Sequence, residues 1–224
     1  MGSAPIRIAA LPLALVLYSH TSGCSIETDD ARAARRAAER YLAALTAHDA
    51  AALHAGGTYA GAVQSVRGAT ILRLGRVHSI SRSALDSLAA GSRDDEKRAE
   101  TDCSRAVEWD ADSLFLRLDA MKRRAGLYRS ASRAAERSRM GAPGARAAVA
   151  ETGAAATLRA CAVRVRIRWG GPLVGPEAVD REHVLREVAA PGGPWVVFSL
   201  EQREDDWNAG FPASAPFPTA AGRD

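Results

Sequence analysis

One short stretch of the chain, residues 161–169 (CAVRVRIRW), alternates strictly between apolar and arginine side chains. The apolar residues are Val163, Val165, Ile167 and Trp169, and the residues between them are Arg164, Arg166 and Arg168. This period of two predicts a β-strand with one buried face and one hydrated face. Turn residues separate this strand from two further strands, predicted at 182–189 and 195–202. The chain is therefore expected to end in an antiparallel meander.

Three glutamates, Glu182, Glu187 and Glu201, lie on these later strands and are available to face the arginines across the sheet. Opposite charges on neighbouring strands pair at a hydrated surface, usually for little net energy. We therefore interpret the arginine row as surface pairing and not as a phosphate site.

The N-terminal part of the chain begins with helical periodicity. Over residues 31–47 the apolar side chains recur at intervals of three and four, which predicts an amphipathic helix. A tight corner and a second, short helix at 50–54 follow. The branched residues at 70–74 and 77–81 then favour two short strands.

The middle of the chain is predicted to be helical. A short helix is expected over residues 84–90, and Gly91 and Ser92 would end it. From Asp112 the apolar residues again step by four and three, which predicts a long amphipathic helix that stops at the glycine- and proline-containing stretch 141–144.

This long helix carries arginines at positions 129, 133 and 137. Arg129, Arg133 and Arg137 form an i, i+4, i+8 stripe that could face anionic lipid headgroups. The alternative is a solvated helix face in an arginine-rich chain.

The first residues resemble the export signal of bacterial lipoproteins. Arg7 precedes an apolar run at 8–18, and small residues lead directly to Cys24 in the string TSGC. The resemblance is to a lipobox, although Thr21 stands where leucine is usual. It implies a signal peptide at 1–23, a lipid on Cys24 and a tether at 24–30. The protein would then be held on the extracytoplasmic side of a membrane in the cell envelope.

Two other interpretations of this segment remain open, an ordinary cleaved signal and an uncleaved helix. The apolar run is short for the second, because a membrane-spanning helix needs about 20 residues.

Two cysteines remain besides Cys24. Cys103 and Cys161 form an even pair, and an oxidising compartment favours a disulfide between them. The alternative is two buried free thiols. A metal site is not expected, because no further ligand sits at suitable spacing beside either cysteine.

The string YLAALTAHDAAALHA at 41–55 resembles the opening of nuclear transport factor 2-like domains, and the order of helices first and a meander last is similar to that family. The resemblance implies an α+β fold in which N-terminal helices pack on a curved antiparallel sheet that forms a cone. The single domain would span 31–207, with a long inserted helical segment at about 93–157. A disordered, Pro/Ala-rich tail is expected at 208–224.

Ketosteroid isomerases and polyketide cyclases share that fold, and the resemblance implies a pocket with an Asp or His base opposite a Tyr or Asp. The available residues are Tyr41, Tyr59, His78, Asp119 and His183. None of them lies in a catalytic motif, and the sequence contains no glycine-rich phosphate loop, His-Glu-x-x-His pair or Gly-x-Ser-x-Gly elbow. We therefore assign no catalytic residue, metal site or cofactor from the sequence.

Charge excludes one class of partner. The chain has 30 Lys and Arg against 26 Asp and Glu, a net charge of +4, which is too small to indicate nucleic-acid binding. The sequence favours an envelope lipoprotein that binds a small apolar ligand or an envelope protein, with a homodimer through the sheet left open. The alternative is an isomerase, cyclase or hydratase of the ketosteroid isomerase type.

Overall fold

The structure is a computed structural model that describes residues 28–55, 65–105, 111–143, 156–171, 175–204 and 216–217. The predicted signal peptide, Cys24, Tyr59 and most of the tether lie outside these residues. The elements are α1 (Asp29–Thr46), α2 (Ala50–Ala55), β1 (Val66–Leu74), β2 (His78–Ser81), α3 (Arg82–Arg105), α4 (Ala111–Met140), β3 (Thr157–Gly171), β4 (Gly175–Ala189) and β5 (Val196–Gln202).

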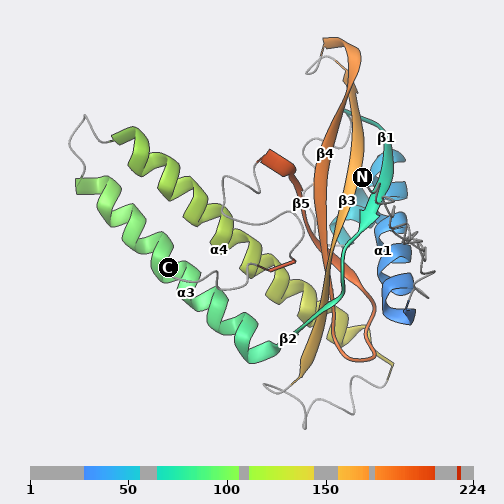
Figure 1. Cartoon of the computed structure of the whole chain (residues 1–224), viewed down its shortest axis with the longest axis horizontal. Helices are drawn as coiled ribbons and strands as arrows, with labels where there is room; N and C mark the ends of the chain where they lie inside the picture. Colours follow the sequence, from blue (N-terminus) through green and yellow to red (C-terminus); the bar gives the residue numbers. More distant parts are fainter. Residues whose placement is uncertain are drawn as a thin grey trace, which may run out of the picture.

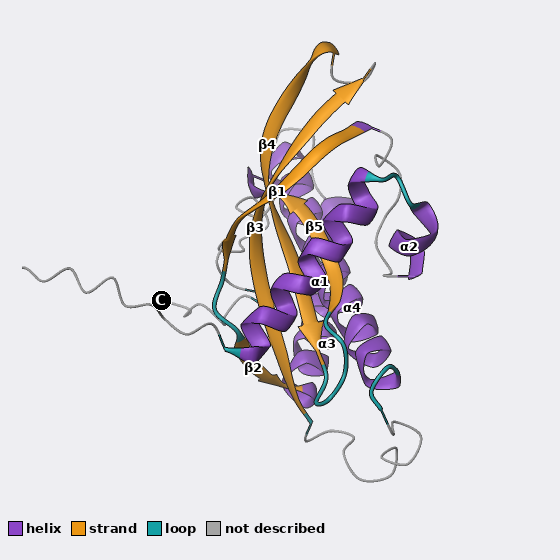
Figure 2. Cartoon of the chain, turned by 90° about the vertical axis from the view of Figure 1, so that its right-hand side faces the viewer, coloured by secondary structure: helices purple, strands orange, loops and turns teal. Residues whose placement is uncertain are grey.

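The sheet is antiparallel throughout, with the strand order β1-β3-β4-β5. β2 pairs with the same edge of β3 as β1 does, nearer the beginning of β3. The sheet is curled but does not close on itself, and the hairpin of β3 and β4 projects beyond the other elements (Figures 1 and 2). The structure thus confirms the predicted α+β class and the curved antiparallel sheet.

Helices cover both faces of the sheet (Figure 1). The odd-numbered residues of β3, such as Val163 and Val165, point to the face that carries α1, here called the α1 face. They form a core with Ala38, Leu42 and Leu45 of α1. The strict alternation at 161–169 therefore predicted this buried face correctly.

The opposite face, here called the α4 face, carries the even-numbered residues of β3. At the beginning of β3, Leu158 and Ala160 pack with Leu127 and Ala131 of α4 and with Leu85 of α3 in a second core. Farther along β3 the same face carries the arginines. α3 and α4 form a helical hairpin, which we call the arm, whose outer end diverges from the sheet (Figure 1).

Phe217 belongs to the second core, although it lies in the tail predicted to be disordered. Its ring stacks on Tyr128 at 6.4 Å and on Phe198 at 5.8 Å between centroids, and its side chain is buried. The prediction was wrong at this position because an aromatic ring can bury its surface against the core from within a Pro/Ala-rich segment. Apart from Pro216 and Phe217, the residues of the predicted tail lie outside the described part.

α3 is longer than predicted, because it runs through Gly91 and Ser92 to Arg105. A glycine inside a helix costs roughly 1 kcal/mol relative to alanine. Burial of Ala89, Ser92 and Ala99 on α3 accompanies its packing against α4 and opposes this local cost. The helical segment therefore begins at Arg82 rather than near residue 93.

Candidate functional site: an arginine-lined pocket

A cavity of about 440 Å³ opens on the α4 face, where the chain passes from β1 to β2 along the edge of β3. Four arginines and one histidine contribute to its walls. The lining residues are Arg73, Gly75, Arg76, His78, Ala162, Arg164 and Arg203.

Strand register brings the first two arginines together. Arg73 of β1 lies directly opposite Arg164 of β3, and directly opposed residues of an antiparallel pair share one face. A register shift between Ile71 and Arg73 places Arg73 beside Arg164. Two guanidinium groups therefore project from neighbouring strands into one space.

The floor of the pocket depends on a close backbone contact. The Gly75 N–H donates to the Ala162 carbonyl oxygen at 2.9 Å. A Cβ atom on residue 75 would lie 2.5 Å from that oxygen, so the approach requires glycine. At this contact the chain passes from β1 to β2 along one edge of β3, with Arg73 before Gly75 and Arg76 after it.

Glu182 of β4 holds the remaining two arginines. Its Oε2 accepts from Nη2 of Arg164 at 2.6 Å and from Nη1 of Arg203 at 3.1 Å. The hydrogen bond from Arg164 is the main reason why the pKa of Glu182 is lowered, and Arg203 adds to it. Two of the four guanidinium groups are thus held in place by one carboxylate.

Arg73 and Arg76 have no acidic partner among the residues that the structure describes, and both are exposed. Guanidinium groups remain charged at physiological pH. The pocket therefore gathers four positive charges, and Glu182, which does not line it, binds two of the four arginines.

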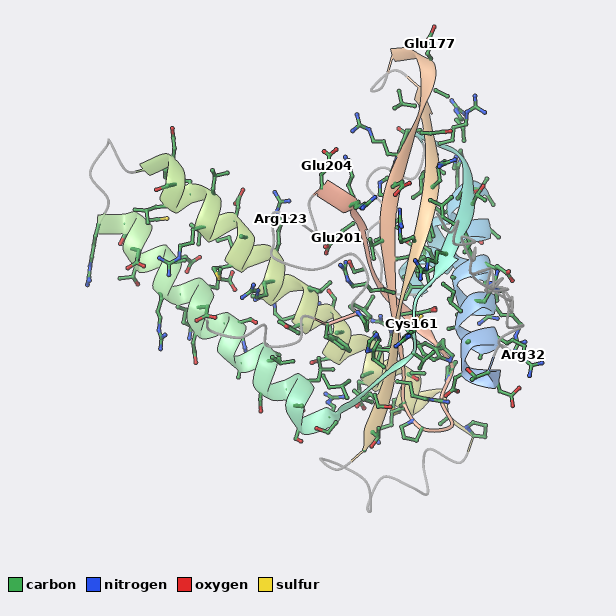
Figure 3. All side chains as sticks on the ribbon, viewed as in Figure 1. Arg32, Arg123, Cys161, Glu177, Glu201 and Glu204 are labelled. Atoms are coloured by element: carbon green, nitrogen blue, oxygen red, sulfur yellow. The ribbon has the colours of Figure 1, made fainter. Side chains whose placement is uncertain are left out.

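The structure confirms the predicted surface pairing of the arginine row for Glu182 and contradicts it for Glu187 and Glu201. Glu182 does pair with Arg164, but Glu201 binds the buried Arg186, with Arg186 Nη1 lying 3.4 Å from Glu201 Oε2. Glu187 lies on the α1 face and reaches none of the arginines on β3. Figure 3 shows Glu201 and Glu204 at the end of β5, near the side of the sheet that carries α4.

Arg166 and Arg168 continue the row along β3, on the same face, but they do not line the pocket. Both side chains are exposed. They provide natural controls, because they share the strand, the face and the charge of Arg164.

The arginine stripe on α4 lies away from this pocket. Nη1 of Arg129 donates to Glu96 of α3 at 3.0 Å. Arg133 is exposed, and Arg137 is half-buried, with a pKa lowered first by burial and then by the charge of Arg133. Only part of the predicted stripe is thus presented to solvent.

The residues considered for ketosteroid isomerase chemistry are not brought together. Tyr41 is buried in the core beneath α1, and His183 is buried on the α1 face beside Trp169, 5.5 Å between ring centroids. His78 lines the arginine pocket on the other face, whereas Asp119 is exposed on α4. Of the five predicted candidates, Tyr59 lies outside the described residues.

The predicted disulfide between Cys103 and Cys161 is not formed in the structure, and both thiols are free. Cys103 lies at the outer end of the arm, where its Sγ donates to the carbonyl oxygen of Leu114 at 3.2 Å. Cys161 is buried in the middle of the sheet (Figure 3), with its Sγ 3.5 Å from the carbonyl oxygen of Gly75. The sequence contains an even pair, but the fold places the two thiols in different layers.

A second hollow lies between α1 and β1, where the predicted cone would offer an apolar cavity. It has a volume of about 630 Å³ and opens widely to solvent. Its lining is mainly small and aliphatic and comprises Glu39, Leu42, Ala43, Thr46, Ala47, Ala69, Thr70 and Ile71. Its lining offers few polar side chains that could orient a ligand.

Comparison with protein-family models, curated proteins and solved structures finds no match to this chain. No helix within the described ranges is long and apolar enough to cross a membrane. The same residues contain no cluster of three or more side chains suited to hold a metal ion.

Sequence reasoning found Arg164 but missed the pocket. Arg73 and Arg76 lie about 90 residues before Arg164 and about 130 before Arg203, and none of the four belongs to a motif. The only local signal was the pair of arginines around Gly75.

Proposed function

We propose that this protein is a lipid-anchored, non-enzymatic binding protein of the bacterial cell envelope, and that its arginine pocket holds an anionic ligand. The observation that carries the binding proposal is the convergence of four arginines on a single cavity, two of which are held by Glu182. The anchor proposal depends on the resemblance of residues 1–24 to a lipoprotein signal.

The chemistry of the pocket favours binding. Guanidinium groups offer positive charge and several N–H donors, but they do not accept a proton at physiological pH. Glu182 orients two of them before a ligand arrives, which lowers the entropy cost of binding. An anion that enters would meet Arg73 and Arg76 on one side and Arg164 and Arg203 on the other.

The resemblance to nuclear transport factor 2-like domains remains part of this proposal. The order of two helices, two strands, a helical segment and a final meander supports it. That family uses the hollow between helix and sheet, which here corresponds to the apolar groove. The ligand that we propose instead occupies the opposite face.

The anchor can be tested by producing the full chain in a bacterium and separating membranes from soluble material. We expect the wild-type protein in the membrane fraction and a Cys24→Ala variant in the soluble fraction. If the variant stays with the membranes, the anchor proposal fails.

Native mass spectrometry of the detergent-extracted protein tests the binding proposal. We expect an adduct of an anionic small molecule that is lost in an Arg73→Gln/Arg76→Gln variant and retained in an Arg166→Gln/Arg168→Gln variant. An adduct that survives the first variant would place the ligand elsewhere. The same spectrum would show whether two copies associate, the possibility that the sequence left open for the sheet.

A further inference from the structure

We infer that the ligand of the arginine pocket carries a phosphate dianion, as a phosphate monoester or inorganic phosphate does. This inference rests on the proposed binding function and names the chemical class of its ligand. Three features of the pocket support it, namely the balance of charge, the number of donors and their arrangement on two sides.

The charge balance favours a dianion. Arg73, Arg76, Arg164 and Arg203 bring four positive charges, and Glu182 bound to two of them brings one negative charge. A monocarboxylate would leave two of the positive charges uncompensated. A phosphate monoester carries about −1.5 to −2 at pH 7 and offsets most of the excess.

The number of hydrogen-bond donors also favours phosphate. Each guanidinium group has several N–H donors, and the hydrogen bonds to Glu182 use Nη2 of Arg164 and Nη1 of Arg203. The Nε of Arg164 has no acceptor among the described residues. A phosphate group presents three strong acceptor oxygens, whereas a carboxylate presents two.

The arginine donors lie on two sides of the pocket. Arg73 and Arg76 flank Gly75 in the β1–β2 connection at the edge of the sheet, and Arg164 and Arg203 lie on the inner side of the pocket, where both bind Glu182. A tetrahedral group can direct different oxygens to the two sides, and arginine matches phosphate oxygens with paired N–H donors. A planar carboxylate can do so only in one orientation.

The experiment is isothermal titration calorimetry on the full chain in detergent, with inorganic phosphate and a phosphate monoester as probes. Succinate serves as a dicarboxylate of similar charge, and sodium chloride at matched ionic strength serves as the control for screening. We expect both phosphate probes to bind, and succinate to bind at least ten-fold more weakly.

Two double variants test which arginines bind the phosphate probes. An Arg73→Gln/Arg76→Gln protein should lose about ten-fold or more in affinity for each arginine removed. An Arg166→Gln/Arg168→Gln protein removes the same charge from the same face and should bind as the wild type does. Both pairs are exposed, so we expect both variants to fold, which circular dichroism verifies.

The possible outcomes distinguish an error in the phosphate class from an error in the proposed anion pocket. If succinate binds as well as phosphate or better, and Arg73→Gln/Arg76→Gln abolishes that binding, the phosphate class is wrong and the anion pocket stands. If no anion binds, or both variant pairs weaken binding equally, the pocket itself is wrong and the proposed function falls with it.

Vesicles then distinguish a soluble ligand from a lipid headgroup. The unlipidated Cys24→Ala protein is mixed with phosphatidylcholine vesicles that contain either phosphatidic acid, which has a phosphate monoester, or phosphatidylglycerol, which has a diester. Selective sedimentation with phosphatidic acid that depends on Arg73 and Arg76 would identify a lipid headgroup. Binding of the free monoester without sedimentation would identify a soluble ligand.

Discussion

Glu187 of β4 lies directly opposite Cys161 of β3, and both side chains are fully buried on the α1 face. Neither carboxyl oxygen of Glu187 has a hydrogen-bond partner among the described residues. Burial therefore raises the pKa of Glu187 well above its ordinary value of 4.5, and the charge of Arg40 on α1 opposes this only in part. The folded protein keeps this carboxyl neutral over a pH range in which an exposed glutamate is charged.

This burial makes stability depend on pH in a definite direction. Above a pH of about 4.5 the unfolded chain releases the proton of Glu187, whereas the folded chain retains it up to its raised pKa. The free energy of unfolding therefore falls as pH rises through that window. We predict that Glu187→Gln removes this decline, so that the variant gains stability over the wild type as pH increases.

Urea unfolding at a series of pH values measures this effect. Glu182→Gln is the matched control, because Glu182 lies on the same strand but its pKa is lowered by Arg164 and Arg203. That variant should lose stability relative to the wild type at neutral pH and not at acidic pH. If wild type and Glu187→Gln show parallel pH profiles, Glu187 is ionised in the folded state and our interpretation is wrong.

The two free cysteines should react at different rates with a thiol reagent. Burial, with a contribution from Glu187, raises the pKa of Cys161 to about 12, whereas Cys103 is only half-buried at the outer end of the arm. The thiolate is the reactive form, so we predict fast alkylation of Cys103 and protection of Cys161 in the folded protein.

Peptide mapping by mass spectrometry identifies the modified residue. In urea both cysteines should react, which controls for the reagent. Recovery of a peptide pair joined through Cys103 and Cys161 from freshly extracted protein would contradict the separated thiols of the structure.

Two glycines of the chain should respond to alanine in opposite ways. At Gly75 an added Cβ would lie 2.5 Å from the Ala162 oxygen, so Gly75→Ala should destabilise the fold by about 1–3 kcal/mol and weaken anion binding. At Gly91 the added Cβ would meet nothing within 4 Å, and the residue lies inside α3. Gly91→Ala should therefore stabilise by roughly 0.5–1 kcal/mol.

Thermal and urea unfolding of both variants measure the difference. Equal destabilisation by the two substitutions would show that α3 does not continue through Gly91 and that the predicted helix end was right after all.

Ser138 of α4 forms two hydrogen bonds with the β4–β5 turn. Its Oγ donates to the Pro194 carbonyl oxygen at 2.6 Å and accepts from the Ala190 N–H at 2.8 Å. Ser138→Ala removes both hydrogen bonds, leaves the buried Ala190 N–H without this partner and should cost about 1–3 kcal/mol of unfolding free energy.

Ser132 on the same helix provides the control for this substitution. Its Oγ is buried without a hydrogen-bond partner in the described part, so Ser132→Ala should be neutral or slightly stabilising. Urea unfolding compares the two variants. A Ser138→Ala protein as stable as Ser132→Ala would mean that the turn is not held by α4.

Phe217 should contribute to stability although it lies in a Pro/Ala-rich segment. Its ring packs between Tyr128 and Phe198 in the second core, so Phe217→Ala should destabilise by about 3 kcal/mol. Phe115, 58% exposed near the outer end of the arm, is the control, and Phe115→Ala should change stability by less than about 0.5 kcal/mol. Similar small effects of both substitutions would place Phe217 outside the core.

The strong hydrophobic periodicities were sufficient to predict three of the helices and strands from the sequence. Period two at 161–169 and the three-to-four spacing at 31–47 and from Asp112 predicted β3, α1 and α4, because a repeat is a property of the chain alone. The end of α3 was not predictable in this way. Gly91 weakens a helix locally, and packing against α4 overrides that preference.

The arrangement of charges required the fold. Glu182 and Glu187 are an odd number of residues apart on β4, so the alternation of side chains along the strand puts them on opposite faces of the sheet. Helices cover each face in some places and leave it hydrated in others. Which acid meets an arginine therefore depends on where α1 and α4 lie. The local sequence predicts which side chains share a face of a strand, but it does not predict which part of that face a helix covers.

The pocket depends still more on long-range contacts. Arg73 and Arg164 come from β1 and β3, and Arg203 directly follows β5. They meet because register shifts and the Gly75–Ala162 contact set how the chain runs along the edge of β3. Composition and motif carry no information about that arrangement. Charge can be counted along a chain, but its concentration in one cavity arises when strand pairing brings distant side chains to the same face.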